Sequence, residues 1–146
     1  MNDRTKSLLF DFIQISSIIF ILFSGPVIAS RTILIFFQML AILILLISVW
    51  EMRRTRFYRI PDVGKQQELV KSGIFKFIRN PMYLSQIMFC GVLLIESYSV
   101  LRLLIYLIFV TSFVFKIQYE EVLLKSYFKE YEVYEKTSWR LAPFIY

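Results

Sequence analysis

Two long apolar runs in the first third of the chain constrain its fold more than any other feature. Residues 12–30 and 32–50 contain no charged side chain. Each run is about 19 residues long, close to the roughly 20 that cross the hydrocarbon core of a bilayer as a helix. A signal peptide has a shorter apolar region of ~7–15 residues, and here a second run follows at once. A tight turn around Arg31 therefore predicts an antiparallel pair of membrane helices, near residues 8–29 and 32–53.

A second pair of apolar runs follows a polar central segment. Residues 81–95 and 103–115 are uncharged but shorter, and each alone would be marginal as a membrane span. Glu96 and Arg102 lie between them and can extend their charged ends to the headgroup region. The two runs therefore predict a helical hairpin, with helices near residues 81–99 and 101–120.

The composition supports a membrane protein and excludes several kinds of chemistry. The chain has 146 residues, is 58% hydrophobic and has a mean hydropathy of +0.62, whereas soluble domains contain ~45–50% apolar residues. It has one cysteine, Cys90, and no histidine, which excludes an internal disulfide, a Cys–His zinc site and a histidine general base. We expect Cys90 to be a small buried hydrophobic residue, and we expect no metal. The net charge is +6, but the basic residues flank apolar segments, which predicts contacts with lipid headgroups rather than with nucleic acid.

The distribution of Lys and Arg predicts the orientation. If the N-terminus is cytoplasmic, few basic residues, among them Arg31 and Arg102, lie on the far side, in agreement with the positive-inside rule. Both termini then face the cytoplasm. Beyond Lys116 charged and aromatic residues alternate, which predicts a helix along the membrane surface. We predict one all-α integral-membrane domain, 1–146, with four transmembrane helices in two antiparallel pairs: a helix pair over 1–53, then an interfacial loop, a hairpin and a C-terminal surface helix over 54–146.

Two polar clusters lie at the cytoplasmic ends of the predicted hairpin. One is the Arg-Asn-Pro-Met-Tyr sequence of residues 79–83, and the other is Glu120 with Glu121. Ionisable groups at this depth are costly, so a functional role is the first hypothesis. The simpler alternatives are a solvated helix end, with neighbouring lysines as partners, and an arginine that extends to the headgroups. Asp11 has two similar interpretations, an interfacial residue at the start of the first helix or a functional carboxylate.

The two clusters belong to longer patterns that resemble a known family. Residues 69–84 read LVKSGIFKFIRNPMYL, and residues 120–134 read EEVLLKSYFKEYEVY, followed by Arg140 and Pro143. The first is similar to the pattern L-V-x-x-G-aromatic-x-x-hydrophobic-R-[HN]-P-x-Y, and the second to E-E-x-x-L-x-x-x-F-x-x-Y-x-x-Y. Both patterns are typical of the isoprenylcysteine carboxyl methyltransferase and phospholipid methyltransferase family. The resemblance covers residues 66–146, and two patterns in the right order make it fairly specific.

The resemblance implies an integral-membrane enzyme that uses S-adenosyl-L-methionine and acts on a lipidic or lipid-attached acceptor. Its cofactor pocket would lie at the cytoplasmic face, roofed by the C-terminal segment and open sideways to membrane lipids. By this resemblance Arg79, Tyr83 and Glu121 are the catalytic candidates. The cofactor-binding candidates are Gln67, Leu69, Val70, Gly73, Ile74, Phe75, Arg79, Asn80, Pro81, Tyr83, Glu120 and Glu121.

The chemistry of these residue types suits that cofactor. A carboxylate pair at a helix end can accept an ammonium or ribose hydroxyls, and the Arg79 guanidinium offers a rigid donor fork to a carboxylate. The N–H groups at the start of the helix that begins at Pro81 can bind an anion. Tyr83 and Phe75 can pack on an adenine or face a sulfonium. Methyl transfer needs no metal, so we expect its rate to come from alignment and desolvation.

Three positions depart from the pattern of many relatives. Lys129 stands where many have Gly after the Phe of the second pattern. Asn80 stands where many have His, and Tyr127 stands where carboxyl-methylating relatives tend to have Arg. The sequence therefore leaves other functions open beside the favoured isoprenylcysteine carboxyl methyltransferase type. One is a phospholipid or amine N-methyltransferase on the same scaffold. The others are a relative that binds the cofactor without turnover and a non-catalytic membrane scaffold or transport protein.

Overall fold

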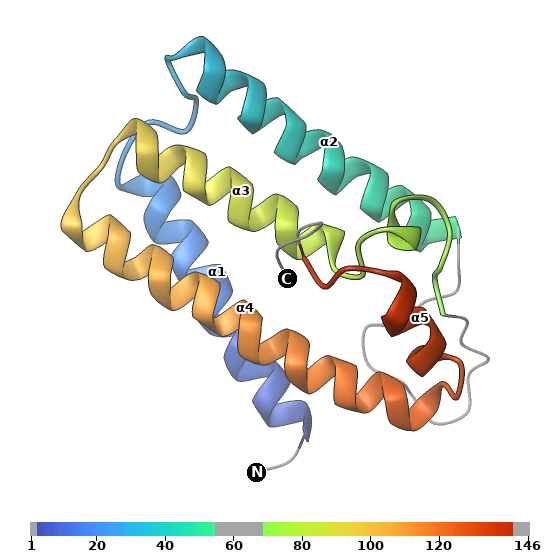
Figure 1. Ribbon diagram of the computed structural model, residues 1–146. Helices are drawn as coiled ribbons and strands as arrows, with labels where there is room; N and C mark the ends of the chain where they lie inside the picture. The colour runs from blue at the N-terminus through green and yellow to red at the C-terminus, as the bar shows by residue number, and fades with distance from the viewer. Residues whose placement is uncertain (1–2, 55–68, 142–146) are drawn as a thin grey trace.

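The structure, a computed structural model, describes residues 3–54 and 69–141, and within these ranges every regular element is a helix (Figure 1). Four of the described helices are long and form a bundle, and the two short ones, η1 and α5, lie near the end where α2 finishes and α3 begins (Figure 1). The all-α prediction is confirmed for these residues. The α-helices are α1 (Asp3–Phe23), α2 (Thr32–Arg54), α3 (Pro81–Glu96), α4 (Val100–Tyr127) and α5 (Tyr131–Thr137), and a 3-10 helix, η1, covers Gly73–Lys76.

Three of these helices are long and apolar enough to cross a membrane, over Lys6–Phe23, Thr32–Arg53 and Val100–Tyr127. The 16 residues of α3 extend only about 24 Å, less than the ~30 Å thickness of a hydrocarbon core. Length and composition therefore support three of the four predicted spans. By the same measure the 28 residues of α4 extend about 42 Å. This helix continues to Tyr127 instead of ending near residue 120, so its last turns reach beyond the core.

Local sequence explains where the other helix ends differ from prediction. α1 ends at Phe23 rather than near residue 29, because Gly25 and Pro26 follow and the residue before a proline is disfavoured in a helix. α3 ends at Glu96 rather than near residue 99. Ser99 instead caps α4, because its side-chain oxygen accepts a hydrogen bond from a backbone N–H in the first turn at 3.2 Å.

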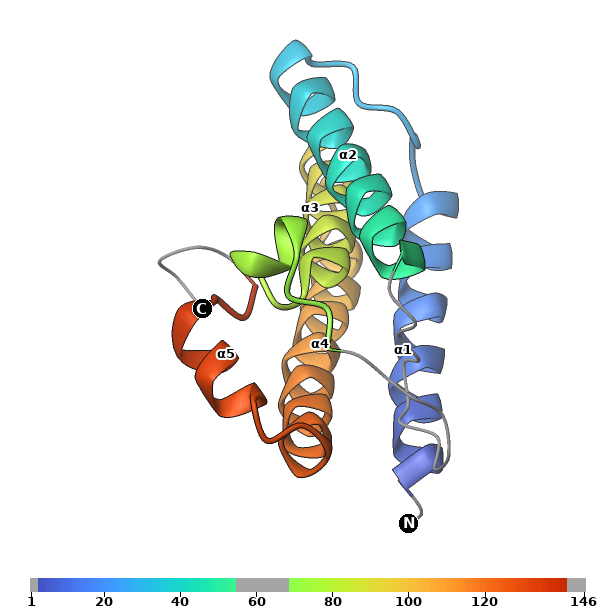
Figure 2. The same cartoon turned by 90° about the vertical axis from the view of Figure 1, so that its right-hand side faces the viewer.

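The predicted pairing of the first two helices is wrong. α1 packs mainly against α4, and α2 mainly against α3, with antiparallel chain directions in both pairs (Figure 1 and Figure 2). Residues 24–31 form an irregular link rather than a tight turn. Gln38 of α2 holds this link, since its side chain accepts a hydrogen bond from the Ala29 N–H at 3.0 Å and donates one to the Val27 carbonyl at 2.6 Å.

A continuous apolar core joins α1, α3 and α4. Ile21, Cys90, Leu93, Phe109 and Phe113 belong to it, and each is at most 1% exposed. The rings of the two phenylalanines pack edge to face with centroids 4.8 Å apart. The outer faces of α1 and α2 also carry many large apolar side chains, and a bilayer rather than water accounts for such a surface.

The C-terminal segment folds back onto the bundle instead of leaving it as one surface helix. After the short α5, Trp139 pairs with Ile78 in an isolated parallel β-bridge. The Trp139 N–H donates to the Phe77 carbonyl at 2.8 Å, and the Arg79 N–H donates to the Trp139 carbonyl at 2.7 Å. These bonds fix the tail against the residues that precede α3, where the first polar cluster begins.

Candidate active site

The two polar clusters predicted from the sequence meet in the structure. The Arg79 guanidinium binds the Glu121 carboxylate across 42 positions of sequence, with Nε donating to Oε1 at 3.1 Å and Nη2 at 3.1 Å from the same oxygen. Both side chains are 5% exposed. Beside this ion pair, the Tyr83 hydroxyl lies within hydrogen-bond distance of both Glu120 oxygens, at 3.0 and 2.8 Å. The hairpin of α3 and α4 therefore assembles one site from both patterns.

Glu121 is bound by two arginines. Its Oε2 lies 2.9 Å from Nε of Arg140. Arg79 in turn donates through Nη1 to the Glu135 carbonyl at 2.9 Å and to the hydroxyl oxygen of Ser138 at 3.2 Å, and it also bonds the Ser138 carbonyl. This network connects the start of α3, the C-terminal third of α4 and the segment after α5. It therefore docks the C-terminal segment on the hairpin.

Asn80 holds the same segment through the backbone. Its N–H and its side-chain amide both donate to the Arg140 carbonyl, at 3.1 and 3.0 Å. Its own carbonyl accepts from the Tyr83 and Leu84 N–H groups in the first turn of α3, in which Pro81 takes an early position. The contact of the side chain is a hydrogen bond to a carbonyl, so this role needs a donor rather than a titratable group.

A cavity of about 270 Å³ lies where α2, α3, α4 and α5 come together. Its wall is mainly apolar and aromatic with a few polar groups, as in most small-molecule sites, and its volume is near the lower end of their usual range of ~300–1,000 Å³. The lining residues are Met52, Leu69, Val70, Phe75, Arg79, Asn80, Pro81, Met82, Tyr83, Glu120, Leu123, Leu124, Tyr131 and Tyr134.

Most of the residues predicted to bind a cofactor line this cavity, but not all of them. Gly73, Ile74 and Glu121 do not line it, and Gln67 lies outside the described residues. Tyr131 and Tyr134 also line the cavity, although they were not among the predicted binding residues. Both belong to the second family-like pattern, so that pattern could have identified them. Met52 had no such signal, because only the packing of α2 on α3 brings it here. The predicted residues in the wall are Leu69, Val70, Phe75, Arg79, Asn80, Pro81, Tyr83 and Glu120.

Gly73 shapes the loop beside the cavity. Its φ of +56° lies in the left-handed region that other residues seldom adopt. A Cβ at this position would lie 2.5 Å from Oε1 of Glu51 in α2. The neighbouring Ser72 hydroxyl donates to the other oxygen of Glu51 at 2.9 Å. The end of α2 is therefore bound to the loop that brings Phe75 into the cavity wall.

Two tyrosines of α5 contribute neutral aromatic rings to the wall. Tyr131 and Tyr134 pack edge to face with centroids 5.9 Å apart, and the Tyr134 hydroxyl donates to the Phe75 carbonyl at 2.5 Å. Burial raises the pKa of Tyr134 to about 12, and burial also raises the pKa of Tyr131 above its usual range. Both phenols therefore stay protonated near neutral pH, and their ring faces suit an adenine or a cation.

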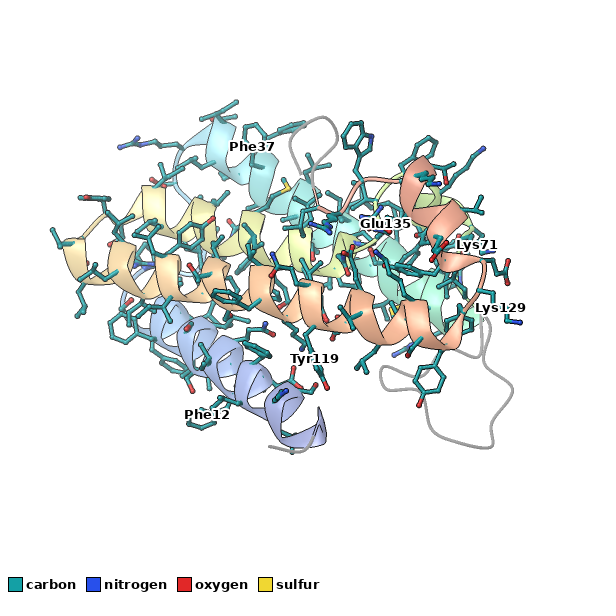
Figure 3. The ribbon with its side chains drawn as sticks, turned by 60° about the horizontal axis from the view of Figure 1, so that its bottom comes forward. Phe12, Phe37, Lys71, Tyr119, Lys129 and Glu135 are labelled. Atoms are coloured by element: carbon teal, nitrogen blue, oxygen red, sulfur yellow. The ribbon has the colours of Figure 1, made fainter. Side chains whose placement is uncertain are left out.

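Glu135 ties α5 to the end of α4. Figure 3 shows it on the side of α5 that faces α4, and its Oε2 lies 2.7 Å from Nζ of Lys125. The hydrogen bond from Lys125 is the main reason that the pKa of Glu135 lies below its ordinary value. The carboxylate is therefore ionised near neutral pH and supports the docked position of α5.

Among residues 3–54 and 69–141, no group of three or more His, Cys, Asp or Glu is placed to hold a metal ion. The polar part of the cavity wall consists instead of one carboxylate, one guanidinium, an amide and phenols. Such a donor set suits an organic ligand with charged and aromatic parts.

Fold and site together define a helical membrane protein in which a hairpin and a folded-back tail build one ligand cavity. The phospholipid methyltransferase family matches residues 17–131. This match covers most of the chain, so the protein belongs to that family of membrane methyltransferases, and the resemblance found in the sequence is confirmed. The comparison with curated proteins gave no match, and neither did the comparison with solved structures.

Proposed function

We propose that this protein is an S-adenosylmethionine-dependent methyltransferase that methylates the amine of a membrane lipid. The observation that carries the proposal is the cavity where both family-like patterns meet, with the Glu120 carboxylate and three tyrosines, Tyr83, Tyr131 and Tyr134, in its wall. A carboxylate among aromatic rings favours a cation, and the cofactor carries a sulfonium and an ammonium. When bound, it supplies an electrophilic methyl group.

The residues of the wall divide into ligand contacts and positioning residues. Glu120 would accept hydrogen bonds from the ammonium or ribose hydroxyls of the cofactor, and Phe75 with the α5 tyrosines would pack on its adenine. Arg79 lines the cavity, but its guanidinium is engaged with Glu121 and the tail. In this proposal Arg79 and Glu121 therefore act mainly by docking the C-terminal segment over the site.

Charge favours an amine acceptor over a carboxylate. A carboxylate acceptor needs a cation beside it, and Arg79 is the one cationic side chain among the described lining residues. Because its Nε and Nη1 groups already bind Glu121, Glu135 and Ser138, it has little capacity for a second carboxylate. The Glu120 carboxylate also gives the cavity wall a negative charge, which favours an amine acceptor over a negatively charged carboxylate acceptor.

The length of α4 supports a cavity at the boundary of the bilayer. Glu120 lies about 30 Å along this helix from its first residue, which equals the ~30 Å thickness of the hydrocarbon core. We propose that this end is cytoplasmic, with both termini on the same side. Single cysteines introduced at Arg31 and Lys129 test the orientation with a membrane-impermeant reagent. Labelling of only Arg31→Cys from outside the cell is expected, and labelling of both from one side would contradict it.

The central experiment measures binding and transfer separately. Protein purified in detergent is titrated calorimetrically with S-adenosylmethionine, and the methyl-labelled cofactor is then offered with vesicles of phosphatidylethanolamine or with a farnesylated cysteine. We expect binding, and transfer to the phospholipid only. Glu120→Gln should lose both, while Glu132→Gln, an exposed glutamate of α5, should behave like the parent. Transfer to the farnesylated cysteine alone would establish the carboxyl-methylating type instead, and the absence of binding would refute the proposal.

A further inference from the structure

A buried lysine lies between the cavity and the first helix. Lys116 of α4 has no exposed side-chain surface. Its Nζ forms an ion pair with Asp11 of α1, lies 3.9 Å from Oε1 of Glu120, and sits 5.5 Å from the centroid of the Tyr83 ring. The contact with Asp11 is the shorter of the two carboxylate contacts. A cation in this position must be paired, because an isolated charge is costly away from water.

The packing of the bundle sets this arrangement. α1 runs along α4 in the views of Figure 1 and Figure 3, and Figure 3 shows Tyr119 on the side of α4 that faces α1. Asp11 projects from α1 at the level of Lys116, one helical turn before Glu120. Two carboxylates from different helices therefore compete for one ammonium, and only Glu120 lines the cavity.

We propose that Asp11 holds the Lys116 ammonium on the α1 side, so that the negative charge of Glu120 acts on a cationic ligand in the cavity. Asp11 and Lys116 are then positioning residues that set the charge preference of the site. Asp11 lies outside residues 17–131, which match the family, so the proposal makes the first half of α1 part of the functional unit. It rests on the proposed function, because it takes the cofactor as the cation.

The proposal predicts opposite effects for the two partners. In Asp11→Asn the Lys116 ammonium loses its closer carboxylate. Among the described residues, Glu120 is then the carboxylate that forms an ion pair with it. The ammonium should then neutralise Glu120, and a cation in the cavity should bind less well. In Lys116→Met a positive charge near Glu120 disappears, and the cavity should favour a cation more strongly. A purely structural role would make both variants lose affinity alike.

The measurement is the ratio of two dissociation constants for each variant. S-Adenosylhomocysteine lacks the methyl group and the sulfonium charge but otherwise matches S-adenosylmethionine. Contacts to the ammonium and ribose are common to both ligands and cancel, so the ratio isolates the effect of the Glu120 charge on the sulfonium. We expect Asp11→Asn to lower the preference for the sulfonium ligand about tenfold, a typical size for coupling between sites. Lys116→Met should raise the preference, Asp11→Glu should keep it, and the exposed control Glu132→Gln should leave it unchanged.

The double variant Asp11→Asn/Lys116→Met guards against misfolding, because it removes the two opposite charges of the ion pair together. Its preference should return close to that of the parent. If both single variants shift the ratio in the same direction, or if neither shifts it, Asp11 and Lys116 only stabilise the bundle and the inference is wrong. If the parent binds neither nucleoside, the proposed function fails and this inference fails with it. If the parent binds both nucleosides but neither single variant changes the ratio, the inference is refuted and the proposed function is not.

Discussion

The substitution Glu121→Gln tests whether the Arg79–Glu121–Arg140 network docks the C-terminal segment. Glutamine keeps the shape of the side chain but removes the charge from two contacts of 3.1 and 2.9 Å. Arg79 would remain buried with its ionic partner gone, and breaking a buried pair in this way typically costs ~3–5 kcal/mol. Arg140 is a third exposed and can be hydrated, so its share is small. We expect a loss of about 3 kcal/mol, the low end of that range.

A loss of this size changes the docking equilibrium of the tail by about a hundredfold. The assay is limited proteolysis in detergent, with cleavage after Lys136 or Arg140 followed by mass spectrometry, together with the thermal unfolding midpoint. Glu121→Gln should accelerate cleavage and lower the midpoint, and its cofactor affinity should fall as a consequence. Glu120→Gln is the matched control, since the adjacent carboxylate lines the cavity and should lose ligand affinity with little change in cleavage. Unchanged cleavage in Glu121→Gln, combined with lost binding, would refute the docking role and make Glu121 a direct ligand contact.

Three further predictions concern the loop, the tail and the first turn of α3. Gly73→Ala should destabilise the protein by roughly 1–2 kcal/mol or more, because the left-handed φ disfavours a side chain and its Cβ would clash with Glu51; a parent-like unfolding midpoint would contradict this. Lys125 lowers the pKa of Glu135, so Glu135 should stabilise the tail fully above its ordinary pKa of 4.5 and lose this effect as the pH falls through the lower folded value. Proteolysis of the parent should therefore become faster in acid. Glu135→Gln should be cleaved faster than the parent at neutral pH and should show a smaller acid-induced rise. Asn80→His should bind cofactor within about threefold of the parent, since one ring N–H can replace the amide donor, and a gain in transfer activity above that would show that a titratable group at this position serves the reaction.

The sequence by itself determined the elements and the two halves of the site. Uncharged runs of the right length predicted α1 and α2, because a helix satisfies its own backbone hydrogen bonds in lipid. The shorter uncharged runs of α3 and α4 were predicted as helices because they pair as a hairpin. The bounds of α2 were predicted almost to the residue, since Arg31 and the basic residues after Trp50 mark both ends of its apolar run. The two family-like patterns lie at the ends of a hairpin, and this placement predicted that Arg79 and Tyr83 would meet Glu120 and Glu121.

Tertiary structure alone decided which helices pair and which way each polar side chain points. An apolar helix surface in lipid carries little preference for a partner, so the sequence could not show that α1 packs on α4, with Asp11 bound to Lys116. Adjacent glutamates point about 100° apart on a helix, and only the packing around α4 directs Glu120 into the cavity while Glu121 binds two arginines. The sequence also could not predict Met52 as a lining residue, because its position in the cavity wall depends on the contact between α2 and α3 and not on any pattern near it.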